Sequence, residues 1–157
     1  MNKIKVGLIG TGAITDLHYL GYENSDILEI EAICDTDPEL LAKRSKEWGV
    51  RYCFTDYNEL LSHSNIDAVE VITPHNLHAE IGKAALIAGK HVSIQKPMAT
   101  KISDCDELIR ISKKSNRLLR VFENFRFYPP MVKAKELLDS GEIGEPLSIR
   151  IKVVQGH

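Results

Sequence analysis

The sequence predicts an α/β protein with one doubly wound parallel sheet. Short β-rich runs alternate with helical segments along the first 123 residues, and this alternation is typical of βαβ units that share a parallel sheet. The first run, residues 4–9, is compact and apolar, as expected of a central strand buried on both faces. It ends at Gly10, where a glycine-rich turn leads into a helix. Six strands with intervening helices have the size and order of a complete doubly wound domain.

The elements of this domain are expected in the following order. Strands are predicted at residues 4–9, 27–34, 52–54, 68–72, 91–94 and 118–122. Helices are predicted at about residues 13–22, from Pro38 to Gly49, and at about 56–63, 77–88 and 103–115. Asp37 is the N-cap expected before Pro38, Gly89 is a stop signal, and Ser103 with Asp106 resembles a weakened capping box.

Residues 124–157 differ in character and predict the start of a second, incomplete α+β domain. An aromatic and proline-rich stretch is followed by a predicted helix over 131–140, which Gly141 ends, and by a predicted strand over 147–154. One helix and one strand cannot form an independent core, so we expect a truncated substrate domain here. Its unpaired apolar strand is a template for a second copy, which predicts a homo-oligomer.

Composition and charge exclude several classes of partner. The chain has 157 residues and a net charge of −2, which gives no electrostatic reason to expect nucleic acid or an anionic membrane as a partner. No apolar run approaches the roughly 20 residues that span a bilayer, and no signal peptide is expected at the start. Cys34, Cys53 and Cys105 are odd in number and far apart, as expected of reduced thiols. These features predict a cytoplasmic protein.

The turn over residues 10–15 reads Gly-Thr-Gly-Ala-Ile-Thr and is typical of dinucleotide binding. Gly10 permits a tight turn, and Gly12 lets the backbone approach a pyrophosphate that would lie over the free N–H groups of the helix. The third glycine of the fingerprint is Thr15 here, so we expect the helix and strand to lie further apart or to pack differently. A simple strand-to-helix turn is the alternative interpretation.

Asp35 strengthens the cofactor interpretation. It ends the second predicted strand, 25 residues after Gly10, where the fingerprint places a carboxylate for the ribose hydroxyls. An ionised aspartate repels a 2′-phosphate, and Thr36 beside it is not basic, so NAD is favoured over NADP, although Arg44 keeps NADP open. Alternatively, residues 35–37 only cap the next helix, but Asp37 alone can serve as that cap.

Further motifs follow the glycine turn in a fixed order. His18 lies on the first predicted helix, and Asp35 precedes a helix that begins with Asp-Pro. The remaining motifs are Asp67-Ala68-Val69, Thr73-Pro74-His75-Asn76-Leu77-His78, Ala88-Gly89-Lys90-His91-Val92, Gln95-Lys96-Pro97, Phe125-Arg126-Phe127 and Gly141-Glu142-Ile143-Gly144. With these motifs in this order, nearly the whole chain resembles the Gfo/Idh/MocA oxidoreductases. The resemblance implies a Rossmann domain that binds NAD, followed by a substrate domain.

The resemblance implies a catalytic role for Lys96. In the family, the lysine of a Glu-Lys-Pro motif lies near the nicotinamide and polarises the substrate hydroxyl. A cation beside this oxygen stabilises alkoxide character as hydride leaves the carbon. A surface lysine in a loop is the alternative. Gln95 replaces the family's glutamate, which removes a negative charge and is expected to loosen the orientation of the lysine. Pro97 also allows a cis peptide bond.

The loop after the fourth predicted strand is expected to lie along the cofactor. Thr73 and Pro74 end this strand at the carboxyl edge of the sheet, and Asn76 or His78 would then face the cofactor or the substrate. Asn76 as a plain helix cap is the alternative. His75 and His78 do not predict a metal site, because two histidines lack further ligands nearby.

The implied function is hydride transfer between NAD(P) and a hydroxyl-bearing carbon of a sugar or polyol, the expected small-molecule partner. The family's downstream Asp-x-x-x-His pair, which binds substrate and moves its proton, does not occur after Gly144, so this chain alone is expected to be inactive. A non-catalytic NAD-binding module or redox sensor is the alternative. A methyltransferase that uses S-adenosylmethionine would share the glycine turn but would not explain Gln95-Lys96-Pro97. The predicted cofactor-binding residues are Gly10, Thr11, Gly12, Ala13, Ile14, Asp35, Thr73, Pro74, Asn76, His78, Gln95 and Lys96.

Overall fold

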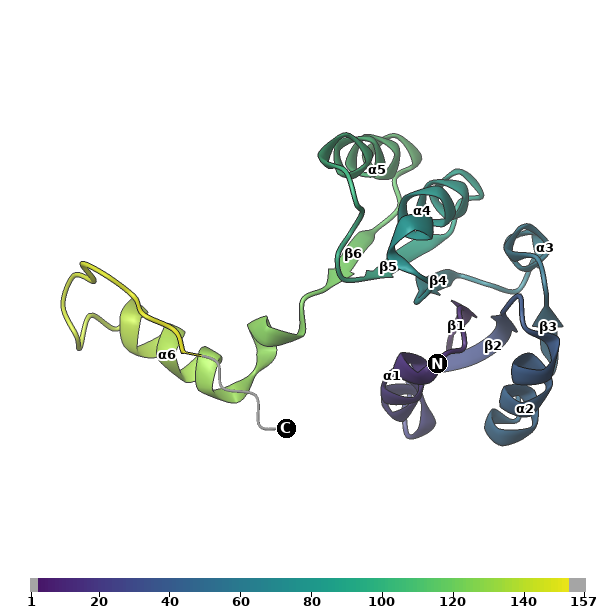
Figure 1. The fold of residues 1–157 in the computed structure, drawn as a ribbon, viewed down its shortest axis with the longest axis horizontal. Helices are drawn as coiled ribbons and strands as arrows, with labels where there is room; N and C mark the ends of the chain where they lie inside the picture. The colour runs from purple at the N-terminus through teal and green to yellow at the C-terminus, as the bar shows by residue number, and fades with distance from the viewer. Residues whose placement is uncertain (1–2, 153–157) are drawn as a thin grey trace. The chain divides into compact units, whose positions relative to one another are not determined.

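A computed structural model of the chain describes residues 3–152. The chain divides into two compact units that meet between Phe122 and Glu123, and each unit is described by itself (Figure 1). The first unit contains the sheet and most of the helices, and the second contains one longer helix.

The first unit is built on a six-stranded parallel sheet with the order β3-β2-β1-β4-β5-β6. The chain moves outward from β1 through β2 to β3, and then returns to the other side of β1 through β4 (Figure 1). This strand order is that of doubly wound dinucleotide-binding folds, so the predicted fold class is confirmed. The strands are β1 (Ile4–Ile9), β2 (Leu28–Cys34), β3 (Tyr52–Phe54), β4 (Ala68–Val71), β5 (His91–Gln95) and β6 (Leu119–Phe122).

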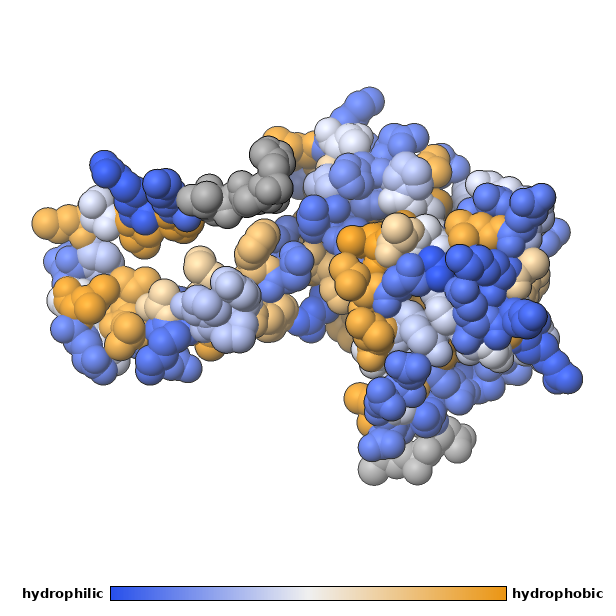
Figure 2. Space-filling model, turned by 60° about the horizontal axis from the view of Figure 1, so that its bottom comes forward, coloured by the Kyte–Doolittle hydropathy of each residue, from blue (hydrophilic) through white to orange (hydrophobic). Residues whose placement is uncertain are grey.

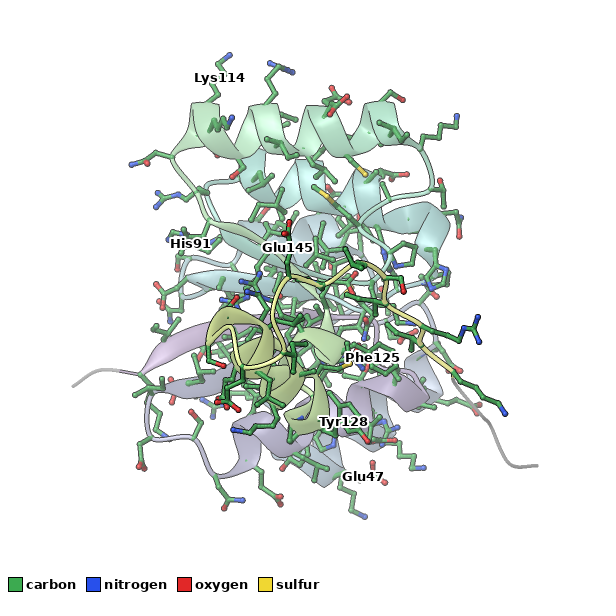
Figure 3. All side chains as sticks on the ribbon, turned by 90° about the vertical axis from the view of Figure 1, so that its left-hand side faces the viewer. Glu47, His91, Lys114, Phe125, Tyr128 and Glu145 are labelled. Carbon is green, nitrogen blue, oxygen red and sulfur yellow. The ribbon has the colours of Figure 1, made fainter. Side chains whose placement is uncertain are left out.

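Helices cover both faces of the sheet. In Figure 3, Lys114 of α5 and Glu47 of α2 mark opposite ends of the first unit. The helices of this unit are α1 (Ala13–Glu23), α2 (Pro38–Trp48), α3 (Tyr57–Ser62), α4 (His78–Ile87) and α5 (Ile102–Ser115), with a short 3-10 helix, η1 (His75–Leu77), before α4. Within residues 3–152, no helix is long and apolar enough to cross a bilayer.

The central strand contributes to a core on each side of the sheet. Alternate residues of a strand point to opposite faces, and Val6 and Leu8 pack in one cluster with Leu41 of α2. Ile9 belongs to a larger cluster with buried side chains of α3, α4 and α5, including Leu108. Because β1 is covered on both sides, its position in the sheet is fixed by burial, as the compact apolar run predicted.

The boundaries of two helices follow the predicted signals. The Asp37 carboxylate accepts hydrogen bonds from the N–H groups of Glu39 and Leu40 at 3.0 and 3.1 Å and caps α2. Gly49 ends α2 with a φ of 67°, and Gly89 follows α4 with a φ of 76°. Such left-handed conformations favour glycine at helix ends, so these sequence signals have a direct structural cause.

The predicted capping box at Ser103 is wrong. α5 begins at Ile102, so Ser103 lies inside its first turn, and no side chain caps the helix. The carbonyl of Lys101 instead accepts hydrogen bonds from Asp104 and Cys105 at 3.2 and 3.3 Å. The first turn therefore closes through the backbone, and the helix begins two residues earlier than a cap at Ser103 would allow.

The second unit contains a 3-10 helix, η2 (Asn124–Phe127), and one longer helix, α6 (Pro129–Asp139). α6 begins two residues before the predicted residue 131, because proline suits the first helical positions, where an N–H group is not needed. Gly141 lies just beyond the helix with a φ of 73°, in agreement with the predicted stop. Figure 2 shows apolar residues on the surface of this unit. Phe125 and Phe127, both in η2, have well exposed side chains.

The strand predicted over residues 147–154 is wrong where the structure describes it. Residues 147–152 form no strand, and Val153 and Val154 lie outside the described residues. Leu147 is 96% exposed, and Ile149 and Ile151 are also exposed. Apolar residues alone do not make a strand, because its backbone groups need a neighbouring strand to pair with. Self-association through this segment stays a prediction, although the strand from which it was inferred is not formed in residues 147–152.

Replacing the α2 cap should destabilise the chain measurably. We expect Asp37→Ala to lower the free energy of unfolding by about 1 kcal/mol, because two N–H groups lose their acceptor. Urea unfolding followed by circular dichroism measures this change. Asp26→Ala, in an exposed turn, is the matched control and should have an effect within about 0.5 kcal/mol. Equal effects of the two substitutions would contradict the capping role.

The cysteines should differ sharply in reactivity. All three are free thiols, with Cys34 buried and Cys53 exposed, and burial raises the pKa of Cys34 to about 12. The thiolate is the reactive form of cysteine, and with this raised pKa Cys34 forms a thiolate only at strongly alkaline pH. We therefore expect iodoacetamide at pH 8 to modify Cys53 but not Cys34. Mass spectrometry of the alkylated peptides measures this, and denaturant should make Cys34 reactive. Equal labelling of both thiols in the folded chain would disprove it.

Candidate cofactor site

A cavity of about 580 Å³ lies at the carboxyl ends of the central strands. It is located where β1 separates the two halves of the sheet, the position at which open α/β sheets bind ligands. Apolar side chains of β1 and of the neighbouring helices form part of its wall, and three aspartates lie along it. The lining residues are Ile9, Gly10, Gly12, Cys34, Asp35, Thr36, Asp37, Leu40, Thr55, Asp56, Tyr57, Ile72, Thr73, Pro74, Leu77 and Ile81.

The glycine turn borders this cavity, and each of its glycines has a distinct structural role. Gly10 has a φ of 94°, and a Cβ atom there would come within 2.7 Å of the Ile72 carbonyl oxygen. A Cβ atom on Gly12 would meet no atom within 4 Å, so the start of α1 is open to a ligand. Gly12 is the N-cap of α1 and no side chain caps this helix, which leaves its first N–H groups free for an anion.

Thr15 has a different role from the glycine that it replaces. Its side chain is fully buried, and its hydroxyl donates a hydrogen bond to the Gly10 carbonyl at 3.0 Å. The helix is thereby tied to the turn by a side chain, where the fingerprint uses close glycine packing. This explains how the turn keeps its shape without the third glycine. Ala13 and Ile14, in the first turn of α1, are exposed.

Asp35 holds the turn in place from the end of β2. Its Oδ2 atom accepts hydrogen bonds from the backbone N–H of Thr11 at 2.7 Å and from the Thr11 hydroxyl at 2.9 Å. Its Oδ1 atom accepts a third bond from the N–H of Asp37 at 3.1 Å. The sequence pointed to Asp35 as a ribose ligand but gave no signal of this structural role. One carboxylate therefore both lines the cavity and fixes the residue between the two glycines.

Arg44 was the residue that kept NADP possible as the cofactor, but its guanidinium is bound by other groups of the protein. Its guanidinium pairs with Asp16 at 2.6 Å and with Glu47 at 2.9 Å, and its Nε atom donates to the Thr11 carbonyl at 3.2 Å. The group also lies 4.9 Å from the centre of the Trp48 ring. Arg44 is buried and does not line the cavity. It connects α1 to α2 and is not free to receive a 2′-phosphate.

The end of β4 places Thr73 and Pro74 in the cavity wall but turns His78 away from it. His78 is completely buried, and its ring nitrogens lie 2.7 Å from the Pro97 carbonyl and 2.8 Å from the Thr73 carbonyl. Both partners are acceptors, so both nitrogens donate together only in the imidazolium form. The ring joins the loop after β4 to the loop after β5, and its nitrogens are not available to a cofactor, contrary to one expectation.

Asn76 does not cap α4. It lies in η1, and neither η1 nor α4 has a side-chain cap, so the alternative interpretation of Asn76 is also wrong. Its side chain is exposed outside the cavity lining. The rings of His75 and His78 lie 5.4 Å apart, but among residues 3–152 no group of three or more metal-binding side chains occurs.

Gln95 and Lys96 lie at the end of β5, outside the cavity lining. Lys96 is exposed, and the Lys96–Pro97 peptide bond is cis. The backbone N–H of Lys96 donates to the Oε1 atom of Gln95 at 2.7 Å. The other end of the Gln95 amide, Nε2, lies 2.9 Å from the Nε2 atom of His18. Gln95 therefore contacts a residue of α1 that the sequence singled out only as part of a motif.

Glu70 is a buried charged residue that sequence reasoning missed. Its side chain in β4 is 1% exposed, its Oε1 atom lies 2.5 Å from His18 Nδ1, and its Oε2 atom accepts from the Tyr22 hydroxyl at 2.6 Å. Burial, reinforced by the Glu70 carboxylate, raises the pKa of Tyr22 above its ordinary value. A glutamate within an otherwise apolar strand was the available signal, because such a residue needs partners inside the fold.

Comparison with known proteins agrees with this geometry. The model of an oxidoreductase family with an NAD-binding Rossmann fold, GFO_IDH_MocA, matches residues 4–123. Myo-inositol 2-dehydrogenase of Thermotoga maritima is 33% identical over 148 residues, which are 94% of this chain and 44% of that protein. The chain thus spans less than half the length of this relative.

Solved structures show the same fold at similar identity. Scyllo-inositol dehydrogenase from Lactobacillus casei, with bound NAD(H) and scyllo-inositol, has a TM-score of 0.86 at 29% identity, covering 92% of this chain and 43% of that one. The WlbA dehydrogenase from Bordetella pertussis, in complex with NADH and UDP-GlcNAcA, has a TM-score of 0.86 at 30% identity, covering 91% and 44%.

The family model covers most of the chain, and the strand order, the glycine turn and the position of the cavity agree with it. The chain therefore belongs to the Gfo/Idh/MocA oxidoreductase family and contains its NAD-binding Rossmann domain.

Proposed function

We propose that this chain forms the cofactor-binding part of an NAD-dependent dehydrogenase that oxidises a hydroxyl-bearing carbon of a polyol or sugar. The observation that carries the proposal is the cavity beside the glycine turn and Asp35, with Lys96 at the end of a neighbouring strand. The inositol dehydrogenases among the relatives support a polyol as the substrate class.

The residues around the cavity fit a dinucleotide. The uncapped start of α1 suits a pyrophosphate, and the open space at Gly12 allows its close approach. We assign the ribose hydroxyls to the Asp35 carboxylate, which lines the cavity. The hydroxyl oxygen of Thr73 is buried and has no hydrogen-bond partner among the described residues, so a ligand group in the cavity would give it one. When bound, NAD supplies the hydride acceptor.

Lys96 is the residue to which we assign polarisation of the substrate oxygen. Its ammonium would donate a hydrogen bond to the reacting hydroxyl and stabilise the alkoxide that develops there. The family's Asp-x-x-x-His pair does not occur after Gly144. We therefore assign the proton acceptor to the part of the relatives that this chain does not cover.

The cavity favours NAD over NADP. Asp35, Asp37 and Asp56 all line it, and a 2′-phosphate near their carboxylates would be repelled. Arg44 is held by Asp16 and Glu47, and Thr36 is uncharged. No cation lines the cavity among the described residues.

A non-catalytic NAD-binding module is the second candidate, and Gln95 is the observation that favours it. The family's motif has a glutamate before the lysine, and this chain has an amide there. This candidate predicts NAD binding without turnover of any polyol, even when a homologous second domain is supplied.

Asp35 should control the choice of cofactor. We expect Asp35→Asn to raise the Kd of NADH about tenfold, because a charge-assisted hydrogen bond to the ribose is lost. The Kd of NADPH should change less, because repulsion of the 2′-phosphate is relieved. Fluorescence titration of the chain with each nucleotide measures both constants, with Asp26→Asn as the matched surface control. Unchanged affinities in Asp35→Asn would refute the ribose contact.

Lys96 should be needed for turnover but not for NAD binding. The test protein is a hybrid enzyme, in which this chain is joined to the part of the Thermotoga maritima dehydrogenase that follows the region similar to this chain. We expect Lys96→Met to lower kcat on myo-inositol about 10²–10³-fold, the effect typical of losing one charge-stabilising group, while the Kd of NADH stays unchanged. Formation of NADH, followed at 340 nm, measures kcat.

Lys101→Met, an exposed lysine on the same loop, is the control and should keep full activity. If the unmodified hybrid binds NADH but turns over no polyol, the NAD-binding module becomes the better account.

A further inference from the structure

A chain of hydrogen bonds connects the buried Glu70 to the backbone of Lys96. From Glu70 Oε1 it runs 2.5 Å to His18 Nδ1. From His18 Nε2 it runs 2.9 Å to Gln95 Nε2, and from Gln95 Oε1 it runs 2.7 Å to the Lys96 backbone nitrogen. Its members come from α1, β4 and β5. It therefore joins a helix on one face of the sheet to the loop that carries Lys96.

The direction of every bond follows from one fixed donor. The backbone N–H of Lys96 can only donate, so the Gln95 atom that faces it must be the amide oxygen. The NH₂ group of Gln95 then faces His18 Nε2, which must accept and so carries no proton. The proton of the neutral imidazole is consequently on Nδ1, which donates to the Glu70 carboxylate. The Tyr22 hydroxyl donates to the other Glu70 oxygen, so all these groups are satisfied at once.

With the Gln95 amide in place, any other state of His18 disturbs Lys96. If His18 Nε2 carried a proton, two hydrogen-bond donors would face each other, because the NH₂ group of Gln95 points at this nitrogen. Rotating the Gln95 amide by half a turn would relieve this conflict, but it would aim the NH₂ group at the N–H of Lys96 and break that bond. The charge and tautomer of His18 are thereby coupled to the backbone that bears Lys96.

We propose that Glu70 and His18 are positioning residues for Lys96, acting through Gln95, with His18 held as the neutral Nδ1–H tautomer. The proposal rests on the function proposed above for Lys96. The groups that face His18 are the Glu70 carboxylate from β4, the Gln95 amide from β5 and the Phe122 ring of β6, whose centre lies 4.7 Å away. Tyr22, also on α1, reaches the same carboxylate.

The amide at position 95 decides the charge of this cluster. In Gln95→Glu, both carboxylate oxygens are acceptors, so His18 would lie between two carboxylates and would be drawn into the imidazolium form. The Lys96 N–H would keep an acceptor. With Gln95, the group of Glu70, His18, Tyr22 and residue 95 carries one negative charge, on Glu70, which accepts from neutral donors. In Gln95→Glu the group would carry two negative charges, on residues 70 and 95, and one positive charge on His18.

The first test reads the protonation of His18 directly in the 157-residue chain. Long-range ¹H–¹⁵N spectra of histidine-labelled protein at pH 7 distinguish protonated from unprotonated ring nitrogens, and His18→Phe assigns the signals. We expect Nδ1 protonated and Nε2 unprotonated in the unmodified chain, and both nitrogens protonated in Gln95→Glu. A proton on Nε2 in the unmodified chain would overturn the proposal.

The second test asks whether His18 holds the Lys96 backbone. Amide hydrogen exchange of Lys96 should accelerate about tenfold in His18→Phe, as expected for the loss of one stabilising hydrogen bond. Tyr22→Phe is the matched control, because it removes a donor to Glu70 but leaves the bonds from His18 to Lys96 intact. Unchanged exchange in His18→Phe, or equal acceleration in both variants, would overturn the proposal.

Kinetics of the hybrid enzyme separate this proposal from the one on which it rests. We expect Gln95→Leu to lower kcat about tenfold with the KM for NAD unchanged, and Gln95→Glu to recover most of the loss because the acceptor for Lys96 returns. If Gln95→Leu keeps full kcat while Lys96→Met loses it, the positioning role fails and the role of Lys96 stands. If Lys96→Met also keeps full kcat, the proposed function itself fails.

Discussion

The end of β1 lies so close to the end of β4 that no side chain fits between them. A Cβ atom on Gly10 would come within 2.7 Å of the Ile72 carbonyl, so this contact requires a glycine and its positive φ. Asp35 adds the end of β2 to the junction, because it holds Thr11 through two hydrogen bonds. The cavity, the open start of α1 and the contact between Arg44 and the Thr11 carbonyl all depend on this meeting of three strands.

Local signals were sufficient for most of the fold. Strand β1 matches its prediction residue for residue, because burial on both faces leaves an apolar run that is easy to recognise. Asp37 and Gly49 mark α2 because their roles depend only on neighbouring backbone. Prediction failed where the outcome depends on distant groups. Residues 147–152 alternate apolar and polar side chains as a strand would, but a strand also needs a partner. Ser103 does not cap α5, because the first turn of the helix closes on the carbonyl of Lys101.

The site was predicted less completely, for the same reason. The glycine turn and Asp35 belong to a local fingerprint, and both border the cavity. His78 was expected near the cofactor, but its ring is buried between two carbonyl groups, one of them 19 residues further along the chain. Glu70 was not identified, because its partners His18 and Tyr22 are about fifty residues away in sequence. Only the folded chain brings these groups together.

The ties of Arg44 limit the order in which cofactor preference could change during evolution. Its guanidinium joins α1 to α2 through Asp16, Glu47 and the Thr11 carbonyl, so a mutation that freed it for a phosphate would loosen the packing of both helices first. A more accessible path begins at Thr36, which is exposed and follows Asp35 directly. A basic residue there would add a cation and leave the helices undisturbed. A cation added at position 36 therefore costs the fold less stability than the release of Arg44 from its partners would.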